Sequence, residues 1–194
     1  MAFGRFVFGL FYRLGFTPWE GHALPERLRE LADTPSKGKA LDVGAGTGDT
    51  SIYLARQGWS VTAVDFVDVA LKKAVAKARA AGVKVHFIRA DVTQLASSGA
   101  GSGFRLIVDN GCFHGLSDEG RSAYVDQMNA VASPDATLLI AGFREARRRG
   151  PRGFNQPEIE RRFGGQWKLH GSWKDEAVSN DANDPIYVYE LRRK

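Results

Sequence analysis

The stretch ALDVGAGTGDT, residues 40–50, joins a short apolar segment to a helical pattern through a glycine-rich loop. Residues 39–44 have the composition of a buried strand, and residues 49–58 have that of a helix. Glycines allow the intervening backbone to turn tightly and to approach a ligand closely, and the N–H groups at the start of the helix attract negative charge. The stretch therefore predicts a strand, a ligand-binding loop and a helix. The glycines are Gly44, Gly46 and Gly48.

Apolar strands and helical stretches continue to alternate outward from this loop. Strands are predicted at residues 39–44, 60–66, 83–91, 104–110, 136–143, 165–173 and 185–193, and helices at 25–31, 49–58, 68–82, 119–132 and 156–163. Such alternation requires a parallel sheet covered on both sides, and the last two strands are close enough in sequence to pair antiparallel. We predict a single doubly wound, Rossmann-like α/β domain over residues 1–194. Its seven-stranded sheet is mostly parallel with an antiparallel last strand, and helices cover both faces.

Acidic residues stand at two further positions that suit a nucleotide. Asp65 ends the second predicted strand, where a carboxylate can accept hydrogen bonds from both hydroxyls of a ribose. Asp42 lies two residues before the first glycine. A dinucleotide fingerprint reads G-x-G-x-x-G, whereas this loop reads G-x-G-x-G, so a dehydrogenase is disfavoured. The pattern predicts a nucleoside-containing cofactor.

This loop resembles motif I of the class I S-adenosylmethionine-dependent methyltransferases, and the resemblance extends through Asp65 to RADV, residues 89–92. The resemblance implies that the glycine loop lies under the methionine and ribose of S-adenosyl-L-methionine and that Asp42 helps to hold the ammonium. It also implies that Asp65 binds the ribose, that Asp91 binds the adenine amino group and that the backbone of Val92 binds the ring. The predicted cofactor site comprises Trp19, Asp42, Gly44, Ala45, Gly46, Asp65, Phe66, Asp91, Val92 and Asn110.

Two outer segments are similar to the thiopurine and tellurite-resistance branch of that family. Residues 14–31 are similar to a Pro-Trp-acid-x-Gly stretch of that branch, with Trp19 and Glu20 as the matching residues, and residues 104–128 contain a D-x-G-x-x-H pattern. The resemblance implies a segment that folds over the cofactor and an acceptor among thiols, chalcogen anions and small aromatic or heterocyclic molecules. Residues 1–35 are accordingly predicted to form an N-terminal lid, and residues 36–194 the cofactor-binding core.

The catalytic prediction centres on the end of the fourth strand, where open parallel sheets bind their ligands. His114 is the candidate general base for an acceptor that arrives protonated, and a role in packing against the next helix is the alternative. Asp109 is the second catalytic candidate, although it equally suits a role in shaping the turn. Phe113 and Arg144 are predicted to contact the substrate. Cys112 is interpreted as a packing residue.

Composition limits the other classes of function. The chain has 194 residues, 43% hydrophobic and 25% charged, which suits one soluble domain with a real core. Its single cysteine argues against a structural zinc site and favours a reducing, cytoplasmic location. No metal and no membrane span are predicted. The net charge of +5 includes a basic cluster at 144–152 that suits an anionic substrate, RNA backbone or a solvated loop.

The sequence therefore predicts an enzyme that transfers the methyl group of S-adenosyl-L-methionine to a small molecule by direct in-line displacement. An RNA methyltransferase and a non-catalytic cofactor-binding regulator are the alternatives. RNA is the less favoured partner, because the chain leaves no room for an appended RNA-binding domain. The sequence does not choose the acceptor or the oligomeric state.

Overall fold

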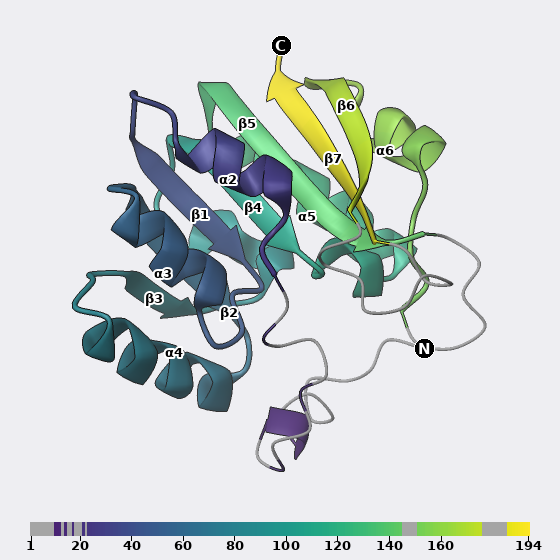
Figure 1. The fold of residues 1–194 in the computed structure, drawn as a ribbon. Helices are drawn as coiled ribbons and strands as arrows, with labels where there is room; N and C mark the ends of the chain where they lie inside the picture. The colour runs from purple at the N-terminus through teal and green to yellow at the C-terminus, as the bar shows by residue number, and fades with distance from the viewer. Residues whose placement is uncertain are drawn as a thin grey trace.

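The computed structural model describes residues 10–12, 14, 17, 21, 23–144, 151–175 and 186–194. A seven-stranded sheet with the order β3-β2-β1-β4-β5-β7-β6 forms its centre. The strands are β1 (Lys39–Val43), β2 (Ser60–Asp65), β3 (His86–Arg89), β4 (Phe104–Asn110), β5 (Ala132–Phe143), β6 (Trp167–Asp175) and β7 (Ile186–Arg193). Figure 1 shows the strands crossing the molecule side by side, with β3 at one edge and β6 at the other.

The strand directions confirm the predicted mixed sheet. β1 runs parallel to β2 and β4, β2 to β3, and β4 to β5, whereas β7 is antiparallel to both β5 and β6. The predicted antiparallel pairing of the last two strands is therefore correct. The insertion of β7 between β5 and β6 could not be read from the sequence, because either strand of a hairpin can pair with the sheet.

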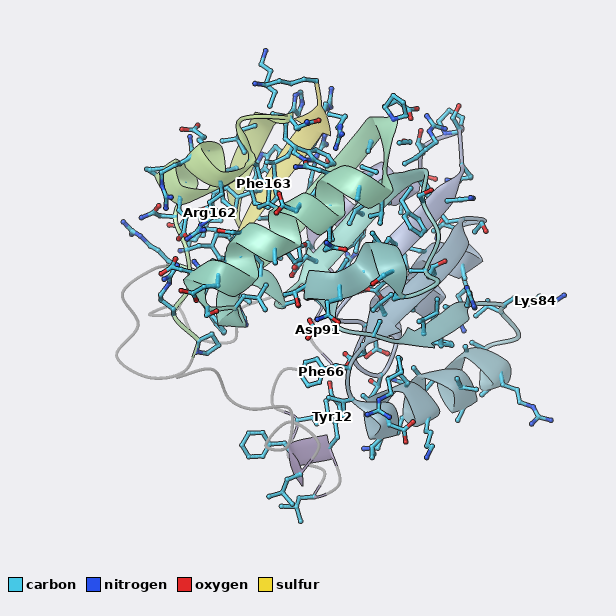
Figure 2. The ribbon with its side chains drawn as sticks, turned by 180° about the vertical axis from the view of Figure 1, so that it is seen from behind. Tyr12, Phe66, Lys84, Asp91, Arg162 and Phe163 are labelled. Atoms are coloured by element: carbon cyan, nitrogen blue, oxygen red, sulfur yellow. The ribbon has the colours of Figure 1, made fainter. Side chains whose placement is uncertain are left out.

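Helices cover both faces of the sheet, as predicted. They are α2 (Glu26–Ala32), α3 (Asp49–Arg56), α4 (Asp68–Ala80), α5 (Asp118–Val131) and α6 (Gln156–Phe163), with 3₁₀ turns η1 (Val92–Ser97) and η2 (Phe113–Gly115). Side chains alternate along a strand, so Leu106 and Val108 of β4 pack in the core beneath α2 and α3, while Ile107 packs in the core beneath α5 and α6. α2 and α3 lie in front of the sheet in Figure 1, and α5 lies in front of it in the reverse view of Figure 2.

Three strands differ from the prediction by two residues or more. β6 runs over Trp167–Asp175 instead of 165–173, because its ladder with β7 extends from the Trp167–Arg193 pair to the Asp175–Ile186 pair. β3 is shorter than residues 83–91, because the Val83 N–H donates to the Ala78 carbonyl at 3.1 Å and so completes the end of α4 instead of a strand. β5 begins earlier than residue 136, since Ala132 pairs with Phe104 ahead of a register shift in the β4–β5 ladder. The start of β3 is thus set by a local bond at the end of α4, whereas the start of β5 is set by pairing with a strand distant in the sequence.

The predicted N-terminal lid lies largely outside the described residues. Tyr12 is described; it is 4% exposed and packs with Val67 and Ala70 at the start of α4. The lid assignment of residues 1–35 stays a prediction. Among the described residues, no helix combines the length and apolar character that crossing a membrane requires.

Candidate active site at the carboxyl edge of the sheet

The register of the parallel strands brings the predicted site residues to one edge. Val43, the last residue of β1, pairs with Val64 on one side and with Asp109 on the other. Asp65 in turn pairs with Arg89 at the end of β3. The glycine loop after β1 is therefore flanked by the acid that ends β2 and by the turn that follows β4. This is the edge where open α/β sheets bind ligands.

The glycine loop has the backbone that its composition predicts. Gly44, Gly46 and Gly48 have φ values of 71°, 54° and 84°, in the left-handed region that favours glycine. The N–H groups of Gly44 and Ala45 donate to the Val64 carbonyl at 2.8 and 3.0 Å. These two bonds tie the loop to β2, so its position follows that of Asp65.

Asp65 organises the loop and the start of α4 together. Its side chain is 6% exposed; one carboxylate oxygen accepts the Gly46 N–H at 2.8 Å, and the other accepts the Val67 N–H at 2.8 Å. Burial raises the pKa of Asp65 above its ordinary value, and the backbone N–H donors oppose that rise. A carboxylate has about four acceptor positions, so the group can still accept a hydroxyl beside its backbone donors.

Asp42 lies beneath the loop and is 2% exposed. It accepts a hydrogen bond from the Ser51 hydroxyl of α3. Burial raises the pKa of Asp42 to about 7, and the negative charges of Asp65 and Asp109 add to the rise. The carboxyl therefore holds a proton much of the time at neutral pH, until a cation approaches. Ser51 escaped the sequence prediction; a serine on the buried face of a helix was its only signal.

Asp109 is fully buried at the end of β4. Its carboxylate accepts the N–H groups of Cys112 and Phe113 at 2.7 and 3.0 Å, and so it closes the turn that leads into η2. Burial raises the pKa of Asp109 to about 6, against these donors. The contacts match the turn-shaping alternative, and the catalytic assignment of Asp109 stays a prediction.

His114 lies between the ends of β4 and β5. Its ring stacks on Phe143 with a centroid distance of 5.1 Å and an interplanar angle of 17°. Two glycines leave room for the ring. A β-carbon added at Gly142 would stand 3.2 Å from His114 Cβ, and one added at Gly111 would stand 3.4 Å from His114 Cε1. The half-buried imidazole is thus held at the predicted edge of the sheet.

The predicted substrate residues have contrasting environments. Phe113 is fully buried and packs with Tyr124, Phe154 and Phe163, so its ring contacts the core in this structure. Arg144 is exposed at the end of β5. Their contact with a substrate stays a prediction. Residues 145–150, which include most of the basic cluster, lie outside the described residues.

Asp91 and Val92 follow β3 on the same edge. Asp91 is half-buried, and one of its carboxylate oxygens accepts the Thr93 N–H at 2.9 Å and the Thr93 hydroxyl at 2.7 Å, which caps η1. The Val92 side chain is buried, 4% exposed. The second carboxylate oxygen of Asp91 is the atom that the predicted adenine contact would use.

The remaining predicted cofactor residues are Asn110, Phe66 and Trp19. Asn110 is exposed at the last position of β4, and Phe66 packs with Tyr12 in a small apolar cluster. Trp19 lies outside the described residues. Within the described ranges, no three His, Cys, Asp or Glu side chains are grouped so that they could hold a metal ion.

Cys112 joins the cofactor loop to the turn that carries His114. A β-carbon at Gly44 would lie 2.9 Å from Cys112 Cβ, so the two backbones approach as closely as a glycine permits. Burial raises the pKa of Cys112 well above its ordinary value, and the charges of Asp109, Asp65 and Asp91 act in the same direction. A protonated thiol is a poor nucleophile, which favours the packing role.

Arg121 of α5 is a buried residue beside the candidate site that the sequence reasoning missed. Its side chain is fully buried and lies over the Phe113 ring at 4.9 Å. The guanidinium donates to the carbonyls of His114 and Gly153 at 3.1 and 2.8 Å and to Glu158 of α6 at 2.8 Å. Arg121 therefore ties the His114 turn to the segment after β5. In the sequence it stands on a charged helix stretch that reads as solvent-exposed.

The comparisons with known proteins agree with this geometry. Residues 40–135 match a family model described as a methyltransferase domain. This range contains the glycine loop, Asp42 in β1, Asp65 at the end of β2 and Asp91 after β3. The chain is a class I S-adenosylmethionine-dependent methyltransferase. Its cofactor is S-adenosyl-L-methionine. The resemblance seen in the sequence is thus confirmed for the family and the cofactor.

Among this methyltransferase's relatives is the 2-heptyl-1-hydroxyquinolin-4(1H)-one methyltransferase of Mycobacteroides abscessus, 28% identical over 78% of this chain and 69% of that protein. The 1,6-didemethyltoxoflavin-N1-methyltransferase of Burkholderia thailandensis has the same fold, with a TM-score of 0.81 and 24% identity over 98% of this chain and 87% of that one. TehB from Haemophilus influenzae also shares it, with a TM-score of 0.75 and 18% identity over 95% of this chain and 65% of that one.

The residues of this methyltransferase suit the cofactor. S-adenosyl-L-methionine carries a sulfonium, an ammonium and two ribose hydroxyls, and the edge of the sheet presents the buried carboxyls of Asp42 and Asp65. The raised pKa values of both carboxyls show that each lacks the full compensation a nearby cation would supply. The left-handed glycines let the loop pack closely, because added β-carbons at Gly44 and Gly48 would stand 2.9 Å from Cys112 Cβ and 3.0 Å from Ala74 Cβ.

Proposed function

We propose that this methyltransferase acts on a small-molecule acceptor that binds beside the turn of His114. The close approach of Gly44 to Cys112 carries the proposal, because it sets the cofactor loop directly against the turn that bears the candidate base. Bound S-adenosyl-L-methionine supplies an activated methyl group on a sulfonium, so the protein chiefly has to align the acceptor. The glycine loop and the turn that carries His114 can align the acceptor, because buried hydrogen bonds fix both of them at the edge of the sheet.

The proposed division of roles is the one that the family resemblance implies. Asp65 binds the ribose, Asp42 faces the cationic methionine end, and Asp91 with the Val92 backbone binds the adenine. Asp109 holds the turn in place, and His114 accepts a proton from an acceptor that arrives protonated. A phenol or hydroxylated heterocycle needs such a base, whereas a thiolate or a chalcogen anion does not.

Release of S-adenosylhomocysteine across a panel of acceptors tests the proposal. The panel contains thiols, halide and chalcogen anions, phenols and nitrogen heterocycles, with RNA at low salt as a further arm. We expect turnover among the hydroxylated heterocycles, since one relative is named for a hydroxyquinolinone. Turnover on RNA alone would reject the small-molecule proposal, and cofactor binding without turnover in any arm would favour a regulator.

We also infer a reducing compartment such as the cytoplasm from the single thiol.

Replacement of His114 with alanine is expected to slow methylation of a protonated acceptor by about 100-fold or more, the usual contribution of a general base. Cofactor affinity should not change, because the base acts on the acceptor. An anionic acceptor should lose far less. His86→Ala is the matched control, since His86 is exposed at the start of β3. Equal kcat for His114→Ala and wild type on a phenol would assign His114 a packing role.

Cofactor affinity is expected to rise with pH through about 7, the pKa of Asp42. Below that pH the carboxyl is protonated and cannot pair with the ammonium, so affinity should fall by up to about tenfold per pH unit. The cofactor-free protein should show the opposite trend in stability. The folded state raises the pKa of Asp42 from 3.8 to about 7. The contribution of Asp42 to the free energy of unfolding therefore falls as the pH rises from 3.8 to about 7.

Calorimetric titration between about pH 5.5 and pH 8.5 measures the effect. The variant Asp42→Asn should bind weakly and with a flat pH profile, whereas Asp49→Asn, which changes an exposed acid of α3, should keep the wild-type slope. A flat profile for the wild-type protein would contradict the assignment of Asp42.

A further inference from the structure

Tyr12 reaches the cofactor loop from a distant part of the chain. Its side chain is 4% exposed and packs with Phe66, Val67 and Ala70. Its hydroxyl lies 2.9 Å from the point where a β-carbon of Gly46 would stand. The phenol therefore occupies space that the glycine leaves open. Figure 2 shows the labelled Phe66 between Tyr12 and Asp91.

Lys73 of α4 holds Tyr12 from the other side. Its ammonium donates to the Tyr12 carbonyl at 3.1 Å and lies 5.9 Å from the centre of the Tyr12 ring. A cation over an aromatic face adds to the hydrogen bond. Lys73 thus fixes both the backbone and the ring of this residue, although the two positions lie 61 residues apart.

Gly46 is the residue whose N–H donates to Asp65, so the Tyr12 hydroxyl stands beside the hydrogen bond that positions the proposed ribose acceptor. A phenol both donates and accepts a hydrogen bond, and its ring gives an apolar surface. At this place it can bound one side of the cofactor site and exclude water from it.

We propose that Tyr12 forms a wall of the S-adenosyl-L-methionine site and that Lys73 is the positioning residue that holds it there. The inference rests on the proposed site residues and adds two that the family motifs do not include. Tyr12, held by Lys73, slows the departure of the cofactor because its ring and hydroxyl cover one side of the site.

Binding of S-adenosylhomocysteine to three variants tests the proposal without an acceptor. We expect Tyr12→Phe to weaken affinity by roughly 3–10-fold, the loss of one hydrogen bond, and Tyr12→Ala to weaken it by at least about tenfold. Lys73→Met should weaken it by about 2–5-fold and raise the dissociation rate. Lys72→Met is the matched control, because Lys72 is the neighbouring exposed lysine and pairs with Asp68 at 2.7 Å.

A second readout is the rate at which S-adenosylhomocysteine dissociates. This rate should be higher in Lys73→Met than in Lys72→Met. Wild-type affinity and dissociation rate in Tyr12→Phe, Tyr12→Ala and Lys73→Met would overturn the proposal. Tighter binding by Tyr12→Ala would also overturn it, because Tyr12 would then obstruct the site. No binding by the wild-type protein would instead overturn the cofactor site as a whole.

Discussion

Replacement of Arg121 with methionine is expected to lower the free energy of unfolding by about 3 kcal/mol, at the low end of the cost of breaking a buried ion pair. The side chain is fully buried and supplies donors to two backbone carbonyls as well as to Glu158. Methionine keeps much of the apolar stem over Phe113 but no donor. The carbonyls of His114 and Gly153 would then lose a buried partner, which is costly.

The loss stays near the low end because Glu158 is not left unpaired. Its other carboxylate oxygen accepts bonds from Arg152 at 2.9 Å and from Arg162 at 2.7 Å. Urea unfolding with an unchanged m-value measures the difference. Arg105→Met is the control, since Arg105 and its partner Asp135 have side chains 39% and 59% exposed and a surface pair contributes about 0–1 kcal/mol. Equal losses in the two variants would show that Arg121 does not hold the turn.

Replacement of Asp65 with alanine is expected to weaken S-adenosylhomocysteine binding by about 1.5–3 kcal/mol, or roughly 10–150-fold. The change removes a charged acceptor for the ribose and also the acceptor of the Gly46 and Val67 N–H groups. The glycine loop and the start of α4 would thus lose their common anchor. Binding of the cofactor would then have to order the loop, and the entropy lost in doing so would weaken the affinity.

Calorimetry with Asp68→Ala as the control isolates this effect, because Asp68 is an exposed acid of α4 only three residues away that pairs with Lys72. We expect wild-type affinity for Asp68→Ala. Unchanged affinity in Asp65→Ala would refute the ribose assignment. A similar loss in both variants would point to disturbance of α4 and not to the carboxylate.

Much of the fold was predictable because its signals are local. The strands that alternate with helices were found by apolar composition and by the residues that end them, and β4 and α6 have the predicted boundaries. The glycine loop was found by spacing, and its left-handed φ values follow from the absence of a β-carbon. Asp42 and Asp65 were found because they precede the loop and end the next strand.

The missed residues act through contacts between distant segments. Ser51 bonds Asp42 from the buried face of α3, and Arg121 holds the turn that precedes its own helix while also reaching α6. Tyr12 meets Gly46 only because α4 carries Lys73 to the same place. A single sequence carries no signal for such pairs, because each residue type alone is ordinary at its position.

The sequence by itself determined the parallel core, the glycine loop and the carboxylates that suit the cofactor, since backbone sterics and side-chain periodicity act within a few residues. Only the tertiary structure decided that β7 enters beside β5 and that Asp109 closes a turn. It also decided that Arg121 bonds the His114 carbonyl and that Lys73 bonds the Tyr12 carbonyl. These features depend on burial and on hydrogen bonds across the fold. The free energy of such contacts exists only once the sheet has brought their partners together.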